Sequence, residues 1–321
     1  MLSRYRAFGP ILLVLLMTVT ASAQSRPDAV EAYNRGCQHY LNGDFDRAIA
    51  EFTRAIDLSS RPTINSHDQS LKAGMGFTDD STDLSPIILV DRITALALSN
   101  RALARFRTGD LKGALADCDR GLAINPGILL LYSNRAALRW ATGNLEGAIS
   151  DYDQLIKKSP KDAQAYDSRG NCRMDKGDVE EALADFDQAI RLNPHNAEFF
   201  CDRGRARLDK ADIDGALADS ERAVELDPRL ARAYYHRGAV WCRKNNLDRA
   251  LADFSQAIEL DPGLAAAYGN RGLLRLRQGR DLEAERDFAE CLKLDPTLKI
   301  ELRERIKAER TKILRAVKDQ I

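Results

Sequence analysis

Small and apolar side chains recur along this chain with a period of 34 residues, and that period predicts the fold. In each unit, position 8 is glycine or alanine, position 20 is alanine and position 24 is usually aromatic. The units begin at Ala29, Ala95, Leu129, Ala163, Ala197, Ala231 and Ala265. Small side chains let two helices approach closely, and the aromatic ring fills the space that they leave. Each unit is therefore predicted to be a helical hairpin that buries its apolar face only against its neighbours.

Turn-forming residues separate the two helices of a unit and end the second one. Gly109-Asp110 and Gly177-Asp178 lie between the helices, where glycine tolerates a positive φ. Proline has no amide hydrogen with which to continue a helix, and it stands at the end of six units, as Pro126, Pro160, Pro194, Pro228, Pro262 and Pro296.

This pattern resembles the tetratricopeptide repeat family over residues 29 to 296, with one interruption. The resemblance implies an all-α fold, a right-handed α-solenoid of stacked helical hairpins that ends in a C-terminal capping helix. Departures from the pattern predict locally softer packing. They are Cys118 and Ser220 at position 24, Gly121, Leu155 and Cys291 at position 27, and Asn245 in place of the turn glycine.

The N-terminal residues predict export. Two arginines precede an apolar stretch, Ile11 to Val19, and the small-residue site Ala21-Ser22-Ala23, as in a cleavable secretory signal peptide. An uncleaved membrane anchor is the alternative, but the apolar stretch is shorter than the roughly 20 residues that a spanning helix needs. We expect a periplasmic or secreted bacterial protein with no membrane insertion after cleavage.

The predicted organisation divides the chain into a leader, seven repeats, an insertion and a cap. It comprises a signal peptide (1–23), repeats at 29–62, 85–128, 129–162, 163–196, 197–230, 231–264 and 265–296, a flexible insertion (63–84) and a capping helix (297–321). The insertion lacks helical periodicity, and its acidic stretch Thr78 to Asp83 lacks the ligand spacing of a calcium loop, so disorder is favoured over calcium binding. Ser85-Pro86 is typical of a helix start and extends the first helix of the second repeat backwards.

The C-terminal segment carries its own apolar stripe. Leu298, Leu302 and Ile306 recur every four residues, and charged residues fill the positions between them. We interpret the segment as a helix that caps the last repeat, since a solenoid end needs a polar outer face. The seam of a coiled-coil dimer is the alternative.

Opposite charges also follow the period. Position 7 is arginine in all units, and position 23 is always acidic, as in Arg169 and Asp185. This regularity predicts a ladder of ion pairs within or between hairpins. Independent solvated charges are the alternative.

The resemblance further implies that the first helices line a binding groove, with positions 2, 5, 6, 9, 12 and 13 facing it. Asparagine recurs at position 6 and can both donate to and accept from a bound peptide backbone. The groove is predicted to be apolar in the first three repeats, acidic in the next two and basic in the last two. The candidate peptide-binding residues are Tyr33, Asn34, Tyr40, Asn100, Phe106, Asn134, Trp140, Asp167, Asp202, Arg232, His236 and Asn270. Large side chains at helical spacing are also typical of a core, so core packing of the aromatic residues stays open.

Charge and motif content narrow the function. Lys plus Arg and Asp plus Glu both number 48, so no net charge attracts nucleic acid or an anionic membrane. The chain has no phosphate loop, nucleophile elbow or zinc-ligand spacing, so we expect no catalytic residues, metal or cofactor. Six cysteines on separate helices favour free thiols, and Cys172 with Cys201 is the least implausible disulfide.

The predicted function is a non-catalytic scaffold or adaptor in the bacterial cell envelope that binds peptide segments of partner proteins. The alternative is a structural unit that oligomerises through its C-terminal helix.

Overall fold

The computed structural model describes residues 27–60 and 86–318, and every regular element in these ranges is helical. The first six helices are α1 (Pro27–Leu41), α2 (Phe45–Ser60), α3 (Pro86–Thr108), α4 (Leu111–Ile124), α5 (Leu129–Ala141) and α6 (Leu145–Lys158). The next eight are α7 (Ala163–Lys176), α8 (Val179–Leu192), α9 (Ala197–Asp209), α10 (Ile213–Leu226), α11 (Ala231–Arg243), α12 (Leu247–Leu260), α13 (Ala265–Arg277) and α14 (Asp281–Leu294). A 3₁₀ turn, Pro296–Leu298, then leads into α15 (Lys299–Lys318). The all-α prediction is confirmed. The predicted signal peptide and the whole predicted insertion, with its acidic stretch, lie outside the described residues.

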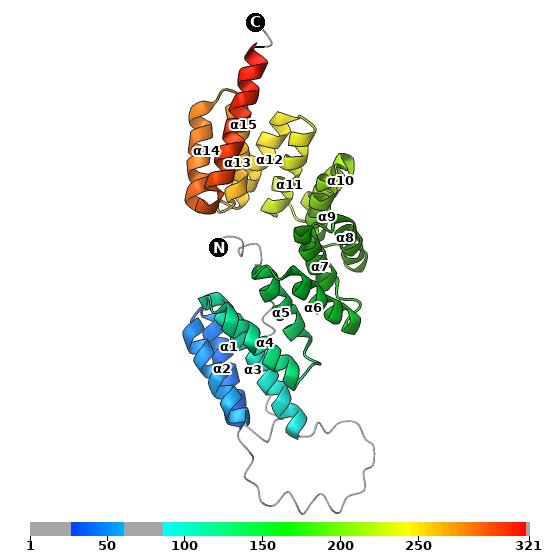
Figure 1. The fold of residues 1–321 in the computed structure, drawn as a ribbon, viewed down its shortest axis with the longest axis vertical. Coiled ribbons are helices and arrows are strands. Elements are labelled where there is room, and N and C mark those ends of the chain that lie inside the picture. The colour runs from blue at the N-terminus through cyan, green and yellow to red at the C-terminus, as the bar shows by residue number, and fades with distance from the viewer. Residues whose placement is uncertain (1–26, 61–85, 319–321) are drawn as a thin grey trace, which may run out of the picture. The chain divides into compact units, whose positions relative to one another are not determined.

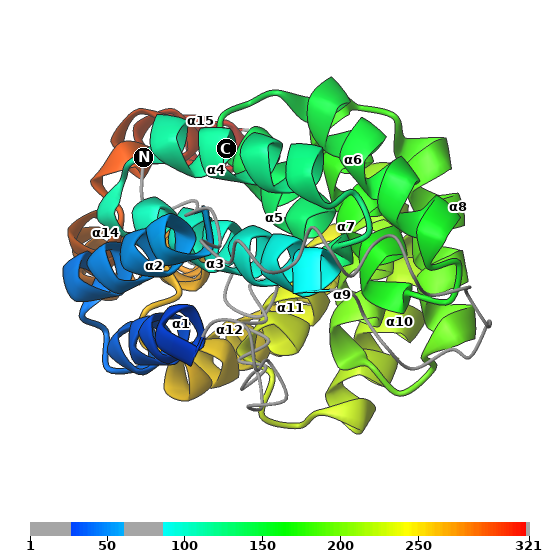
Figure 2. The ribbon, with the colours of Figure 1, turned by 90° about the horizontal axis from the view of Figure 1, so that it is seen from below.

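The described residues form two compact units, one ending at Pro160 and one starting at Lys161. Within each unit, consecutive helices pair as antiparallel hairpins (Figure 1, Figure 2). The second helix of a hairpin packs against the first helix of the next, as α2 does against α3 and α8 against α9. The predicted solenoid packing of helical hairpins is confirmed within each unit.

The two helices of a hairpin pack around the ring at position 24. A Cβ atom added to Gly36 would lie 2.7 Å from the ring of Phe52, and one added to Gly272 would lie 2.6 Å from the ring of Phe288. Such distances are too short for non-bonded carbon atoms, so even alanine would displace the ring or the helix in these hairpins. The predicted match between a small residue and a ring is confirmed here.

Two hairpins without this ring remain tightly packed. Cys118 and Ser220 occupy its position and are fully buried, and α4 and α10 continue through them without a break. A Cβ atom added to Gly121 would lie 2.8 Å from a side-chain carbon of Leu131, so this glycine makes room for a leucine of the next hairpin.

All seven hairpin turns use the left-handed backbone region at position 15. Five of these residues are glycine, and the other two are Ala211, with φ 61°, and Asn245, with φ 56°. Asparagine adopts this conformation readily, whereas alanine places its Cβ too close to the carbonyl oxygen, at a cost of about 1 kcal/mol. The sequence pattern identified Asn245 but not Ala211 as a departure at this turn.

The predicted charge ladder is confirmed, and its ion pairs lie within hairpins. In Arg169 and Asp185, Nη2 lies 2.6 Å from Oδ1 and Nε lies 3.0 Å from Oδ2. The same two-point pairing joins Arg101 to Asp117, and it recurs at Arg135–Asp151, Arg203–Asp219, Arg237–Asp253 and Arg271–Asp287. The first repeat has a single contact of 3.1 Å between Arg35 and Glu51. Because all six aspartates are buried, the alternative of independent solvated charges is wrong.

Some ladder arginines also bind the preceding hairpin. Nη1 of Arg135 lies 2.7 Å from Asp119, and Nη1 of Arg203 lies 2.8 Å from Asp187. A second arginine, at position 11, adds to the same carboxylate in five repeats, as Arg173 does at 2.6 Å from Asp185. The arginines therefore link the two helices of a hairpin to each other and, in some repeats, to the second helix of the preceding hairpin.

The C-terminal helix α15 packs on the last hairpin. Leu302 is 4% exposed and lies in one cluster with Leu276, Phe288 and Cys291, while Leu298, Ile306 and Ile313 pack around that cluster. These contacts use the apolar stripe within the chain, as expected of a cap. No helix in the described residues is both long and apolar enough to span a membrane.

Candidate functional site

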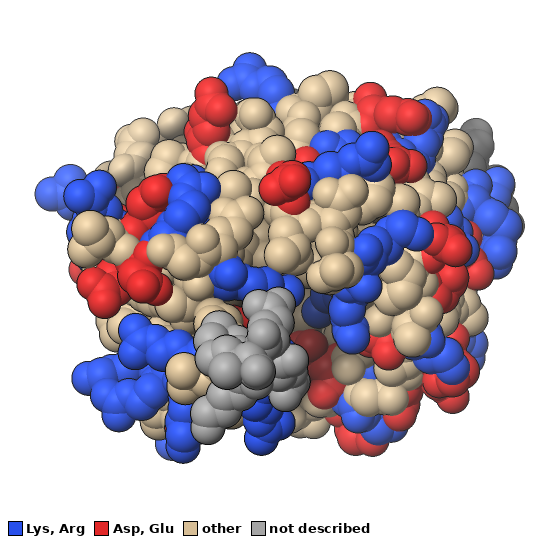
Figure 3. Space-filling model, turned by 90° about the horizontal axis from the view of Figure 1, so that it is seen from above, with Lys and Arg blue, Asp and Glu red and all other residues tan. Residues whose placement is uncertain are grey.

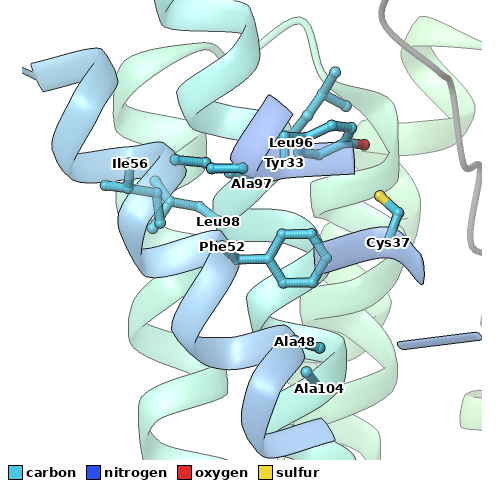
Figure 4. Close-up of a cluster of buried hydrophobic side chains, with 11 residues drawn as sticks. Tyr33, Cys37, Ala48, Phe52, Ile56, Leu96, Ala97, Leu98 and Ala104 are labelled. Atoms are coloured by element: carbon cyan, nitrogen blue, oxygen red, sulfur yellow. The ribbon is translucent and has the colours of Figure 1, made fainter. Parts of the chain in front are cut away.

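Tyr33 lies in the core of the first hairpin. Its side chain is fully buried, with its ring centroid 5.9 Å from that of Phe52 (Figure 4). Burial raises the pKa of its hydroxyl, which accepts a hydrogen bond of 3.0 Å from Nδ2 of Asn100. A ligand cannot reach this side chain without opening the core, so we do not retain Tyr33 as a binding residue.

The recurrent asparagines at position 6 mostly connect repeats. Asn100 and Asn134 are buried, and Nδ2 of Asn134 donates to Oγ of Ser99 at 3.0 Å. Asn270 donates to the hydroxyl of Tyr235 at 3.3 Å. In each case the acceptor is position 5 of the preceding repeat. Asn34 has no preceding repeat, and among the described residues its side chain has no hydrogen-bond partner.

The other N-terminal candidates are partly exposed. Tyr40 lies edge-on to Phe45, with ring centroids 5.3 Å apart, and Phe106 packs on the cluster that contains Leu131. Trp140 is half-buried on α5. Tyr40 and Phe106 combine core contacts with an exposed part, so both interpretations of the aromatic stripe apply to them.

The structure brings Asp167, Asp202 and Arg232 together on three successive first helices of the C-terminal unit. Nδ2 of Asn171 donates to Asp167 at 3.3 Å and to Asp202 at 3.2 Å. Arg232 binds Asp202 at 2.6 Å and also pairs with Glu198. Arg232, which the sequence pattern assigned to the basic zone, therefore offsets part of the negative charge of the predicted acidic zone.

Burial determines the charge states in this network. Burial, and next the carboxylate of Asp202, raise the pKa of Asp167 well above its ordinary value of 3.8. Burial also acts on Asp202, but Arg232 and Arg205 outweigh it and lower its pKa. Burial, together with Arg232 and Arg205, lowers the pKa of His236 to about 3, so this histidine is neutral at physiological pH. One oxygen of Asp167, Oδ1, is buried without a hydrogen-bond partner.

A cavity of about 380 Å³ lies at the C-terminal end of the first-helix face. Half-buried apolar side chains from three first helices line it, namely Leu208 of α9, Ala239 of α11 and Leu273 of α13. The predicted site residue Asn270 also lines it, and α15 forms one wall. Its size is in the range of sites that hold small molecules or a few side chains.

Basic side chains surround this cavity. Arg243, Arg277, Arg305 and Lys312 all line it, against one lining carboxylate, Glu309. Figure 3 shows Lys and Arg interspersed with Asp and Glu over the face that it views. The cavity thus combines an apolar floor with a basic rim.

The described residues hold no cluster of three or more histidine, cysteine or acidic side chains that could bind a metal ion. All six cysteines, including Cys172 and Cys201, are free thiols in this structure. Burial raises the pKa of Cys172 and Cys201, and it raises that of the half-buried Cys242 to about 11.

Two parts of this site were not predicted. Asn171 and Arg205 hold the central network together, with Arg205 donating to Oδ1 of Asn171 at 2.7 Å. Arg305 and Glu309 belong to α15, which the sequence pattern assigned to packing alone. The charged residues on the outer turns of that helix were the feature of the sequence that could have indicated this further role.

Comparison with known proteins agrees with this architecture. Family models described as tetratricopeptide repeats match residues 134–197, 231–264 and 265–298. No curated protein matches the chain.

Two solved structures share the fold. A tetratricopeptide repeat protein from Parabacteroides merdae is 19% identical with a TM-score of 0.67, and the match covers 88% of this chain and 99% of that one. The Cut9-Hcn1 hetero-tetramer of APC/C is 14% identical with a TM-score of 0.60, and the match covers 89% of this chain and 56% of that one. With its repeating hairpins and the three matching repeat models, the chain belongs to the tetratricopeptide repeat family.

Proposed function

We propose that the protein is a non-catalytic scaffold that binds peptide segments of partner proteins on its first-helix face. The observation that carries this proposal is the cavity on that face, lined by Leu208, Ala239 and Leu273 at positions 12 and 9 of their repeats. A hollow with exposed apolar and hydrogen-bonding groups is the usual form of a side-chain pocket. The partners are proteins and not nucleic acids, because the chain has no net positive charge.

Two variants that each replace an alanine by leucine test this function. Short peptides are selected from a random-sequence library on the full chain, and their binding is then measured by fluorescence anisotropy. Ala239→Leu fills the cavity and is expected to weaken binding by about tenfold or more. Ala252→Leu adds the same atoms to an exposed site on the second helix α12, and it should leave binding unchanged.

Circular dichroism and thermal melting establish that both variants fold. Equal binding by the parent protein, Ala239→Leu and Ala252→Leu would place the peptide elsewhere and contradict the proposal. Failure to select any peptide would contradict it as well.

We also propose that the protein works in the bacterial cell envelope, as a periplasmic or secreted protein. The signal-like residues 1–23 support this location. Fractionation of the producing cells and N-terminal sequencing test it, and a protein that starts at Gln24 in the envelope fraction is the expected result. Recovery in the cytoplasm with residues 1–23 intact would contradict it.

Self-assembly through α15 remains the alternative function. Its predicted seam residues Leu302 and Ile306 pack on the chain's own last hairpin, which favours the cap. Light scattering after size exclusion separates the two, because a monomer that binds peptide excludes oligomerisation as the role of α15.

A further inference from the structure

The cavity at the end of the first-helix face has an excess of positive charge. Arg243 is exposed, and its side chain has no ion pair or hydrogen bond with any described residue. Arg305 lies 3.6 Å from Glu301 and donates to Asn270. Arg277 and Lys312 bring the cations at the cavity to four. The carboxylates near them are those of Glu301 and Glu309, so two positive charges are unmatched.

The buried carboxylate of Glu309 fixes part of this rim. It is 7% exposed and lies 2.6 Å from Nε of Arg277 and 3.5 Å from Nζ of Lys312. The hydrogen bond from Arg277 lowers the pKa of Glu309, so Glu309 stays ionised at neutral pH. Glu309 thus holds Arg277 and Lys312 in place, whereas Arg243 can pair with a ligand.

We infer that this cavity binds an acidic peptide segment of a partner protein. An apolar side chain of the segment lies on Ala239 and Leu273, and neighbouring carboxylates bind Arg243 and Arg305. Guanidinium groups bind carboxylates through two parallel hydrogen bonds, which makes arginine well suited to this role. This inference rests on the proposed function and names the chemistry of its ligand.

The lining favours a peptide over a nucleic acid. Proteins that bind single-stranded nucleic acid stack the bases on exposed aromatic rings. The aromatic residue of this lining, Phe254, is fully buried and cannot stack. A free phosphate would leave the apolar floor uncovered. A peptide with adjacent acidic and aliphatic residues uses both parts of the cavity.

The test compares two dye-labelled short peptides on the full chain by fluorescence anisotropy. One contains two aspartates beside a leucine, and the other has asparagines in place of the aspartates. We expect the acidic peptide to bind about tenfold more tightly, with an affinity that falls as salt is added. Arg243→Glu should weaken the acidic peptide by about tenfold, whereas Arg229→Glu, an exposed arginine outside the cavity, should not weaken it.

A second readout locates the peptide. Cys242 lines the cavity and is the one cysteine of the six that is not buried, so the bound acidic peptide should slow its alkylation by iodoacetamide. Equal binding of the two peptides, or equal loss in both arginine variants, would overturn the inference. It would also fail if inorganic phosphate or a single-stranded oligonucleotide displaced the acidic peptide at similar concentration. In each of these cases, library peptides that are sensitive to Ala239→Leu would still support the proposed function.

Discussion

One guanidinium in several repeats joins three helices. Arg203 on α9 binds Asp219 of its own second helix and Asp187 of the preceding one. The ladder carboxylates are buried, so loss of one leaves arginines without their partner in a poorly solvated place. Breaking such a pair costs several times what an exposed ion pair contributes.

Asp185 provides the direct test of the ladder. Asp185→Ala removes the carboxylate shared by Arg169 and Arg173 and should lower the free energy of unfolding by about 3 kcal/mol. Glu259→Ala removes an exposed acid of α12 and should change it by less than about 0.5 kcal/mol. Urea denaturation measures both. Similar small losses in the two variants would show that the ladder adds no stability.

Asp167 should make stability depend on pH. Its pKa is raised in the folded protein, so the folded state keeps a proton that the unfolded state has lost above about pH 3.8. The stability contributed by that proton is complete below this pH and is lost as the pH rises through the raised pKa. Asp167→Asn carries no titrating group at this position. The melting temperature of the variant relative to that of the parent protein should therefore increase as the pH rises.

His236 is present in both Asp167→Asn and the parent protein. Its titration therefore affects both melting temperatures alike and cancels from their difference to first order. His236, Arg205, Arg232, Glu198 and Asp202 face the group or its network, and all remain in the variant. A melting-temperature difference that stays constant from acidic to neutral pH would contradict the raised pKa.

The sequence predicted the ladder partners because every arginine and acid kept the same register within the 34-residue unit. It did not predict the second arginine at position 11, since His39 and Trp241 interrupt that column. The burial of Asn100 was also not predicted, whereas core packing of Tyr33 was the alternative that the sequence left open. Position alone does not show that Tyr33 and Asn100 face each other across neighbouring repeats.

At the scale of elements, the helices end where turn chemistry requires it. The 34-residue pattern of small, aromatic and proline positions predicted seven hairpins, and α3 begins at Pro86, as the Ser85-Pro86 pair indicated. Ala211 was missed because alanine gives no signal for a left-handed turn. The hydrogen bonds of that turn, such as Ala211 N to Leu208 O at 3.1 Å, hold it in this conformation.

The role of α15 can be tested with two leucines of that helix. Leu302 is 4% exposed and Leu314 is 64% exposed. Leu302→Ala should destabilise the protein by about 2 to 3 kcal/mol because it leaves a void against the last hairpin, and Leu314→Ala should have little effect. Thermal melting measures the stability, and light scattering measures the mass. A change of mass without a loss of stability in Leu302→Ala would favour the coiled-coil seam over the cap.

At the scale of the molecule, the chain forms two compact units whose boundary follows Pro160, near the predicted start of the fourth repeat. The repeat period gave no sign of this division, because the hairpin pattern continues through it. The predicted zones of the groove were only partly correct. Arg232 lies among the acids of the preceding repeat, whereas Arg243 and Arg277 of the last two repeats line the cavity.

Photo-cross-linking tests the central claim most directly. A library-selected peptide with a photoreactive group is cross-linked to the full chain, and the attachment sites are mapped by mass spectrometry. We predict cross-links on the first helices α9, α11 and α13 and on the adjoining wall of α15. Cross-links concentrated on the second helices α10, α12 and α14 would contradict binding on the first-helix face.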